Sequence, residues 1–306
     1  MAEQIFHPQL RAARFLPRTT VGPRNLRLFR AGIRLAGLAS RARAQAVQVD
    51  RDVSVQLFRP GSPRQPAPAL LWIHGGGMVF GSALQDARLC RDWAERLGAV
   101  VASVEYRLAP EHPFPLPLED CYTALRWLAA RPDVDTGRIA IGGASAGGGL
   151  AAALALLARE RDLISPVLQL LSYPMLDDRT AARTDADPRR LRIWNNTSNR
   201  FGWRAYLGPA AAGPVPPLAA PARHDDLSGV APAWIGVGTR DLFHDEDVAY
   251  ADRLRQAGVP CALHVVPGAY HAFDILEARA PVSREYLQAQ TEALDTALNG
   301  PGPAGP

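Results

Sequence analysis

The chain of 306 residues contains no lysine, only three cysteines and no apolar run of the roughly 20 residues that a membrane-spanning helix needs. Stable membrane insertion is therefore not expected. Cys90, Cys121 and Cys261 lie far apart and form no CxxC pair, which argues against a zinc site and against a disulfide framework. We interpret them as buried small hydrophobic residues, and we expect no bound metal.

The absence of lysine means that all 34 basic side chains other than histidine are arginines. Acidic residues are interspersed through most of the chain and no DNA or RNA recognition motif is present, so we expect no nucleic-acid partner. The first residues, 1–5, also lack the charged, apolar and small-residue order of a secretory signal, which predicts a cytoplasmic location.

One region is strongly unbalanced in charge. Before Asp50 the only acidic residue is Glu3, whereas the same stretch carries nine arginines: Arg11, Arg14, Arg18, Arg24, Arg27, Arg30, Arg34, Arg41 and Arg43. Four of them, from Arg24 to Arg34, recur at helical spacing and predict a basic amphipathic helix. We interpret it as a helix docked on the protein with a solvated arginine face; a helix on a membrane surface is the alternative.

Alternating apolar residues between Val47 and Leu57 predict an early antiparallel hairpin. Further along, short apolar runs that indicate strands cover 69–73, 99–104, 138–141, 167–171, 233–237 and 261–266. Helix-like segments lie between or after them, at 86–97, 118–130, 146–161, 246–257 and 283–297. This alternation predicts an α/β protein with a largely parallel sheet that is covered by helices on both faces.

The pattern divides the chain into five parts. Residues 46–177 and 224–298 carry the strand and helix signals of one core, whereas 178–223 contain many prolines and no obvious strand. We expect 178–223 to be a cap insertion and 1–45 to supply N-terminal cap helices over the edge of the sheet where such folds bind ligands. Residues 299–306 are too poor in apolar groups to hold a fixed structure and predict a flexible tail.

A glycine-flanked serine is the first chemical signal. Ser145 stands in the segment Gly143-Ala144-Ser145-Ala146-Gly147, which follows the predicted strand 138–141 and opens the predicted helix 146–161. A strand that turns sharply into a helix leaves no room for side chains at Gly143 and Gly147, and it presents the hydroxyl to a pocket. Ser145 is therefore our candidate nucleophile. The alternative is a glycine-rich turn in which the serine only caps the helix.

A second glycine-rich segment, from His74 to Gly77, ends the apolar strand 69–73. Acyl transfer places negative charge on the carbonyl oxygen, and backbone N–H groups that are free of bulky side chains can stabilise it. We expect the N–H groups of Gly75, Gly76 and Ala146 to form such an oxyanion hole. A merely flexible loop is the alternative.

The serine needs a base and the base needs an orienting carboxylate, which follow the nucleophile in the order acid, then histidine. Four histidines lie downstream: His224, His244, His264 and His271. We prefer His271, because it lies in the loop 268–273 just beyond a strand, whereas His264 lies inside that strand. Asp241 follows the strand 233–237 and is our orienting acid. Asp245 is positioned to cap the next helix, which makes it structural.

Together these segments resemble the hormone-sensitive lipase-like branch of the α/β-hydrolases. The resemblance rests on the HGGG segment, the GxSxG segment, the stretch Tyr106-Arg107-Leu108-Ala109-Pro110-Glu111-His112-Pro113-Phe114-Pro115 and the spacing of Asp241 and His271, and it covers about residues 69–275. It implies an α/β-hydrolase fold with a helical cap, homodimers, and carboxylesterase activity on small esters with short or medium acyl chains. The motif glycines and His74 would support the site, whereas Glu111 and His112 would not be catalytic.

The sequence departs from that family pattern at two places. The family commonly has an acid before the nucleophile, where this chain has Ala144, and its acid segment commonly reads Asp-Pro-Leu-x-Asp-Glu, where this chain has Asp241-Leu242-Phe243-His244-Asp245-Glu246. Both departures bear on rate and substrate range. The chemistry needs no metal or organic cofactor. Three other functions remain as hypotheses: a ligand-binding receptor on the same fold, an amidase or peptidase with the same triad, and a membrane-associated lipase.

Overall fold

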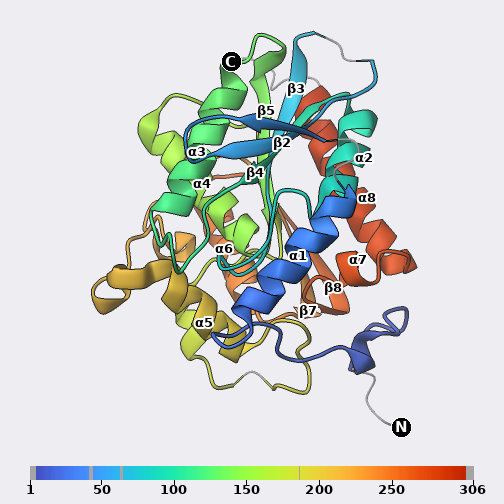
Figure 1. Ribbon diagram of the computed structural model, residues 1–306, viewed down its shortest axis with the longest axis vertical. Helices are drawn as coiled ribbons and strands as arrows, with labels where there is room; N and C mark the ends of the chain where they lie inside the picture. Colours follow the sequence, from blue (N-terminus) through green and yellow to red (C-terminus); the bar gives the residue numbers. More distant parts are fainter. Residues whose placement is uncertain (1–4, 41–43, 63–64, 186, 301–306) are drawn as a thin grey trace.

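The computed structural model describes residues 5–40, 44–62, 65–185 and 187–300. These residues form one eight-stranded sheet in the order β1-β2-β4-β3-β5-β6-β7-β8 (Figure 1). The strands are β1 Gln45–Gln48, β2 Ser54–Phe58, β3 Ala67–Ile73, β4 Val100–Glu105, β5 Val134–Ala144, β6 Leu168–Ser172, β7 Ala233–Arg240 and β8 Cys261–Tyr270.

The pairing pattern confirms the predicted hairpin and the α/β class. β1 and β2 are antiparallel to each other and β2 is antiparallel to β4, whereas all the remaining neighbours are parallel. Every residue of β3 and of β6 is buried, because parallel strands in the middle of such a sheet are covered on both faces. Successive residues accordingly enter different cores: Leu71 and Ile73 pack on one side of β3, and Leu70 and Trp72 on the other.

Helices cover both faces of the sheet (Figure 1). The core that contains Leu71 also contains side chains from α3 (Leu116–Ala129), α4 (Ala146–Arg161) and α6 (His244–Gln256). The core that contains Leu70 contains side chains from α2 (Ala87–Leu97), the short α7 (Phe273–Leu276) and α8 (Pro281–Asn299). The five helices that the sequence predicts at 86–97, 118–130, 146–161, 246–257 and 283–297 are all confirmed, with bounds that differ by at most two residues.

Three local predictions are corrected. β8 runs through Tyr270, so Gly268 to Tyr270 belong to the strand and His271 follows it directly. Asn299 is the last residue of α8 and its amide donates to the carbonyl of Leu97; the rest of the predicted tail, beyond Gly300, lies outside the described residues. Cys90 and Cys121 are buried as expected, whereas Cys261 is half-exposed.

The N-terminal segment and the mid-chain segment lie side by side. The first contains the 3-10 turn η1 (Ala13–Phe15) and α1 (Leu26–Ser40); the second contains η3 (Asp178–Ala182), α5 (Asn196–Leu207), η4 (Gly208–Ala212) and η5 (Pro221–Arg223). Ser198 donates to the carbonyl of Val21, Thr20 donates to that of Ile193, and the N–H of Ile193 donates to Pro17. These hydrogen bonds join segments that are more than half of the chain apart in sequence.

α1 differs from its prediction in orientation. The helix begins at Leu26, so Arg24 precedes it, and Arg30 points toward the protein instead of into solvent. Its guanidinium donates to the carbonyls of Val79 and Ala109 and pairs with Glu111. The prediction of a uniformly solvated arginine face is therefore wrong at Arg30, because backbone carbonyls and a carboxylate are within its reach.

Candidate active site

Four parallel strands end at one edge of the sheet, and each leads into one part of the candidate site. β3 leads into the glycine loop 74–77, β5 into Ser145, β7 into Asp241 and β8 into His271. The carboxyl ends of parallel strands meet at the same edge, where open α/β sheets place their ligand sites. The order of strands thus brings together segments that are 30 to 200 residues apart in the chain.

Ser145 occupies a strained turn between β5 and α4. Its backbone has φ +57° and ψ −122°, a conformation that costs a non-glycine residue on the order of 1–3 kcal/mol. A Cβ on Gly143 would lie 2.3 Å from the carbonyl oxygen of Gly147, and a Cβ on Gly147 would lie 2.0 Å from that of Ile73. The need for small residues on both sides of the serine is confirmed. The Ser145 side chain makes no capping hydrogen bond, so the alternative of a simple helix cap is wrong.

A buried hydrogen-bonded chain links the serine to a carboxylate. His271 Nε2 lies 2.9 Å from Ser145 Oγ, and His271 Nδ1 lies 2.8 Å from Asp241 Oδ2. The other carboxylate oxygen of Asp241 accepts the N–H of Phe243 at 3.0 Å. Each of the three polar residues is at most 6% exposed. The imidazole is further held by edge contacts with the rings of Tyr173 and Phe243, whose centroids lie 4.9 and 5.3 Å away.

The glycine loop after β3 passes directly beside the serine. A Cβ on Gly75 would lie 2.9 Å from the carbonyl oxygen of Ala144 and 3.3 Å from the Cβ of Ser145. Gly76 has φ +130°, where a Cβ would collide with the carbonyl of Phe80. Ala146 is the first residue of α4, and the first N–H groups of a helix have no acceptor within the helix. The backbone of the glycine loop and the first residue of α4 therefore both lie beside Ser145.

His74 lies at the start of this loop but not in the hydrogen-bonded chain. Its ring is fully buried, stacks on Tyr106 with centroids 4.3 Å apart, and has Nδ1 2.8 Å from the carbonyl oxygen of Gly75. Burial lowers the pKa of His74 to about 4, so its imidazole is neutral at physiological pH. The hydroxyl of Tyr106 donates to the carbonyl of His74. These contacts fix the loop and leave His74 unsuited to be the base.

A tryptophan from the mid-chain segment forms one wall of the site. A Cβ on Gly77 would lie 2.2 Å from Cη2 of Trp194, so the indole rests on the glycine loop. Its Nε1 donates to Asn199, and its ring centroid lies 6.4 Å from that of His271. The sequence contains the tryptophan but no periodicity that places it, because its position depends on how the segment 178–223 folds over the sheet.

The other candidate histidines and Asp245 lie elsewhere. His264 lies in β8 and stacks on Trp234 of β7, and His224 is 3.4 Å from Glu160. His244 and Asp245 pair with each other, and Asp245 also pairs with Arg183. Asp245 is structural as expected, but the prediction that it caps α6 is wrong: α6 begins at His244 and has Phe243 at its N-cap position.

Two buried acids in the first turn of α6 were not found by sequence reasoning. Burial raises the pKa of Glu246 to about 8, although its Oε1 accepts the N–H groups of Leu176 and Asp177. Burial, with the nearby Glu246 and Asp241, also raises the pKa of Asp247 well above its usual range. Within the described residues, neither oxygen of Asp247 has a hydrogen-bond partner. Burial therefore favours the neutral, protonated form of both side chains.

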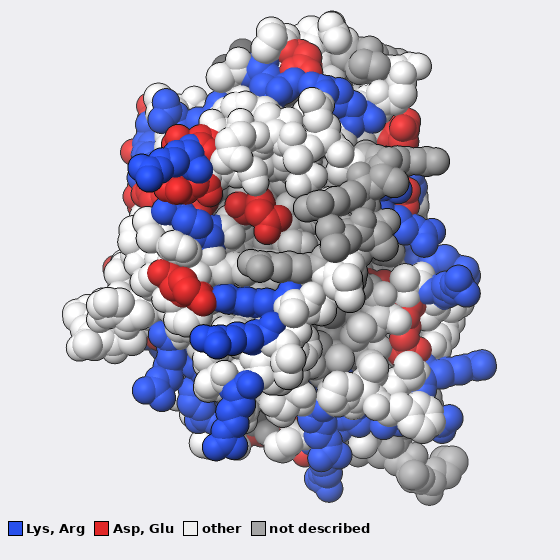
Figure 2. Space-filling model, in the orientation of Figure 1, with Lys and Arg blue, Asp and Glu red and all other residues white. Residues whose placement is uncertain are grey.

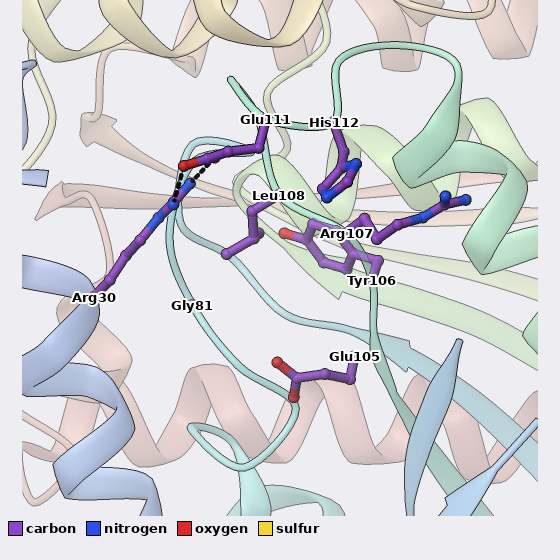
Figure 3. Close-up of a pocket in the computed structure, with 8 residues that line it drawn as sticks. All are labelled: Arg30, Gly81, Glu105, Tyr106, Arg107, Leu108, Glu111 and His112. Carbon is purple, nitrogen blue, oxygen red and sulfur yellow. Dashed lines mark hydrogen bonds and ion pairs between the residues drawn. The ribbon is translucent and has the colours of Figure 1, made fainter. Parts of the chain in front are cut away.

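A cavity of about 370 Å³ lies beyond Tyr106 (Figure 3). Arg30 and Glu111 form a pair at one side of it, and Glu105, which accepts the N–H of Ala83, lies at another. The residues that line this cavity hold the loop that follows Gly77. They do not include Ser145, His271 or Asp241. His112 lines this cavity as well, which agrees with the expectation that Glu111 and His112 are not catalytic.

Within the described ranges, no group of three or more His, Cys, Asp or Glu side chains is arranged to hold a metal ion. The helices in those ranges also include none that is both long enough and apolar enough to cross a bilayer.

Comparison with known proteins agrees with this geometry. A family model described as the alpha/beta hydrolase fold matches residues 70–275. The chain is 35% identical to the esterase LipI of Mycobacterium tuberculosis over 245 residues, which cover 79% of this chain and 77% of that protein. It is 35% identical to an ethyl acetate hydrolase of Pseudomonas putida over 258 residues, covering 80% and 78%.

Solved structures give the same result over nearly the whole chain. A bacterial heroin esterase superposes with a TM-score of 0.87 at 36% identity, covering 96% of this chain and 98% of that one. Esterase LipW of Mycobacterium marinum superposes with a TM-score of 0.85 at 33% identity, covering 97% and 98%. The chain therefore belongs to the α/β-hydrolases, in the hormone-sensitive lipase-like family. Within that family it is a carboxylesterase.

Proposed function

We propose that the protein hydrolyses small esters of short to medium acyl chains through an acyl-enzyme on Ser145, and that it acts in the cytoplasm. His271 is the general base and Asp241 orients it. The N–H groups of Gly75, Gly76 and Ala146 form the oxyanion hole. The observation that carries this proposal is the buried hydrogen-bonded chain from Asp241 through His271 to a strained serine beside the glycine loop.

In the first half of the reaction, His271 Nε2 removes the proton from Ser145 Oγ as that oxygen attacks the ester carbonyl. The carbonyl oxygen becomes negatively charged and is stabilised by the backbone donors, each of which is worth about 10² to 10³ in kcat. The imidazolium then gives its proton to the departing alcohol. In the second half, His271 activates a water that attacks the acyl group, and the serine hydroxyl is restored.

The indole of Trp194 supports the preference for short acyl chains. It rests on Gly77 and lies near His271, so it limits the space beside the reacting carbonyl. The ethyl acetate hydrolase of Pseudomonas putida, one of the relatives, is named for an ester with a two-carbon acyl group. The segments 1–45 and 178–223, which supply the wall residues and their supports, would form the cap of the enzyme.

Replacing Ser145 with Ala tests the assignment. The variant should lose measurable hydrolysis of p-nitrophenyl acetate while keeping its melting temperature, because the side chain supplies the nucleophile and makes no capping bond. Ser228→Ala is a matched control, because Ser228 is exposed and lies in the loop before β7. Retained activity in Ser145→Ala would contradict the proposal. A fluorophosphonate probe should label the wild type and fail to label the variant.

A matched pair of ester and amide substrates tests the reaction type. We expect the ester to be cleaved and the amide of the same acyl group to be cleaved far more slowly. Faster cleavage of the amide would favour the amidase hypothesis. An unlabelled wild-type serine in the fluorophosphonate experiment would instead favour a receptor.

A further inference from the structure

The outward side of α1 is apolar. Leu28 and Leu35 are 77% and 70% exposed, among the most exposed large hydrophobic side chains of the described residues. They are seven residues apart, which is about two turns of helix, so they lie on the same side. Ala31 and Gly32, between them, are exposed as well. We call these four residues the outer face of α1.

The contacts of the opposite side prevent the helix from turning its leucines inward. Arg30 donates to the carbonyls of Val79 and Ala109 and pairs twice with Glu111 at 2.8 Å (Figure 3). Phe29 packs on Phe80 with ring centroids 5.3 Å apart. Rotating α1 to bury its leucines would break these contacts and leave the carbonyls of Val79 and Ala109 without their donor. The exposure of the outer face is therefore built into the fold.

The surroundings of the outer face are strongly basic. Arg24 and Arg27 are exposed beside it, and the sequence from residue 4 to residue 49 contains no acidic residue. On the face of the molecule shown in Figure 2, arginine side chains lie beside the N-terminal part of the path of α1, and acidic side chains lie near them. A surface that combines exposed leucines with arginines that pair with no carboxylate of the described residues matches a layer that has negative charge outside and hydrocarbon beneath.

We propose that the outer face of α1 docks the enzyme reversibly on an anionic lipid surface. Leu28 and Leu35 would enter the boundary between headgroups and acyl chains, and Arg24 and Arg27 would contact the lipid phosphates. A second copy of the chain fits less well, because it would bring another set of arginines against this one. A nucleic acid would use the arginines but gain nothing from the leucines. Since α1 contacts Val79 and Phe80, docking places the lipid surface close to the loop that follows Gly77.

Vesicle sedimentation with the full chain tests this proposal. Vesicles of equal parts phosphatidylglycerol and phosphatidylcholine should pellet the wild type at low salt, and pure phosphatidylcholine vesicles should not. The Leu28→Gln, Leu35→Gln double variant should lower the vesicle partition coefficient at least about tenfold, because most of the burial of two leucines is lost. Leu163→Gln is the matched control, because Leu163 is 66% exposed but follows α4 on another part of the molecule.

Two double variants that remove arginines test the contribution of charge. Arg24→Gln with Arg27→Gln should weaken binding by about tenfold or more, because each arginine near an anionic surface contributes about 1 kcal/mol, or roughly fivefold. Arg88→Gln with Arg284→Gln removes the same charge from exposed positions on α2 and α8 and should bind nearly as the wild type does. Hydrolysis of a water-soluble ester should be unchanged in all these variants, which shows that they are folded.

Three outcomes would overturn the proposal. The first is no sedimentation of the wild type with anionic vesicles. The second is sedimentation that depends on the arginines but is the same for the Leu28→Gln, Leu35→Gln variant and for Leu163→Gln, since binding would then use charge alone. The third is a wild-type dimer in size-exclusion chromatography that the double leucine variant converts to a monomer, since the face would then join two copies.

Discussion

Replacing Asp241 with Asn changes the tautomer of the histidine while keeping the shape of the site. Oδ1 of Asp241 accepts the N–H of Phe243, and Oδ2 faces His271 Nδ1. An asparagine that keeps its oxygen toward Phe243 must point its amide N–H groups at His271. In the ground state the histidine proton therefore lies on Nε2, so that Nδ1 can accept the amide N–H. With its proton on Nε2, the imidazole can no longer accept the proton of Ser145.

The size of the effect follows from burial. To act as a base, His271 of the variant must carry its proton on Nδ1, so two donors face each other. Turning the amide around only moves this conflict to the N–H of Phe243, which is also buried. Leaving two buried donors unsatisfied costs about 1–3 kcal/mol each, or about 2–6 kcal/mol in total. Since 1.36 kcal/mol is tenfold in rate, kcat should fall by about 10² to 10⁴.

The assay is the steady-state hydrolysis of p-nitrophenyl acetate, with a thermal melt to verify that the variant is folded. Asp245→Asn is the control, because Asp245 lies in the same acid segment but has a side chain that is 60% exposed and pairs with His244 and Arg183. Its kcat should change little. A folded Asp241→Asn variant with kcat within a few-fold of the wild type would refute the role given to Asp241.

Trp194→Ala should open the space beside Gly77 and raise kcat/KM for p-nitrophenyl octanoate relative to the acetate by about tenfold or more, since each methylene that gains a buried site contributes about 0.8 kcal/mol. An unchanged ratio would show that Trp194 does not limit the length of the acyl chain. Gly147→Ala should yield insoluble or strongly destabilised protein, because its Cβ would lie 2.0 Å from the carbonyl oxygen of Ile73. Gly137→Ala is the control and should melt as the wild type does, because a Cβ there would come no nearer than 3.4 Å to the neighbouring heavy atoms. Burial raises the pKa of Glu246 to about 8 from its ordinary value of 4.5, so between these pH values the folded state keeps a proton that the unfolded chain releases. The free energy of unfolding should therefore fall over this range by about 1.4 kcal/mol per pH unit from this group. Glu246→Gln lacks that loss, so its melting temperature relative to the wild type should rise from pH 5 to pH 8; a constant difference would mean that Glu246 titrates normally.

The central strands and the helices were predictable because the central strands are covered on both faces, α4 is buried over most of its length, and the other helices carry apolar residues at helical spacing. The strand ends were harder to predict. β5 begins at Val134 instead of Arg138, because Val134 pairs with Ala67 across an irregularity in the register. β7 and β8 extend to Arg240 and Tyr270 through another irregularity. Such stretches contain glycines and polar residues, so hydrophobic periodicity does not identify them as parts of a strand.

The candidate site was predictable in part for a different reason. Ser145, Asp241 and His271 each follow an apolar strand, so a parallel sheet alone brings them to one edge. The orientation of Arg30 and the position of Trp194 depend on contacts with distant segments. Arg30 reaches residues 49 and 81 positions away, and Trp194 rests on a glycine more than 100 positions earlier. Helical spacing gives the angle between two side chains on α1, but it does not say which of them faces the protein.

The acid segment shows how burial assigns different roles to neighbouring carboxyl groups. Asp241 Oδ1 accepts the N–H of Phe243, and its Oδ2 lies 2.8 Å from His271 Nδ1. Asp247 lies in the same segment with no hydrogen-bond partner among the described residues, and burial raises its pKa and that of Glu246. A second negative charge there would stabilise the imidazolium as well, but it would also repel the charge on Asp241. Burial thus favours the neutral form of Glu246 and Asp247, and Asp241 is the carboxyl group of this segment that contacts His271.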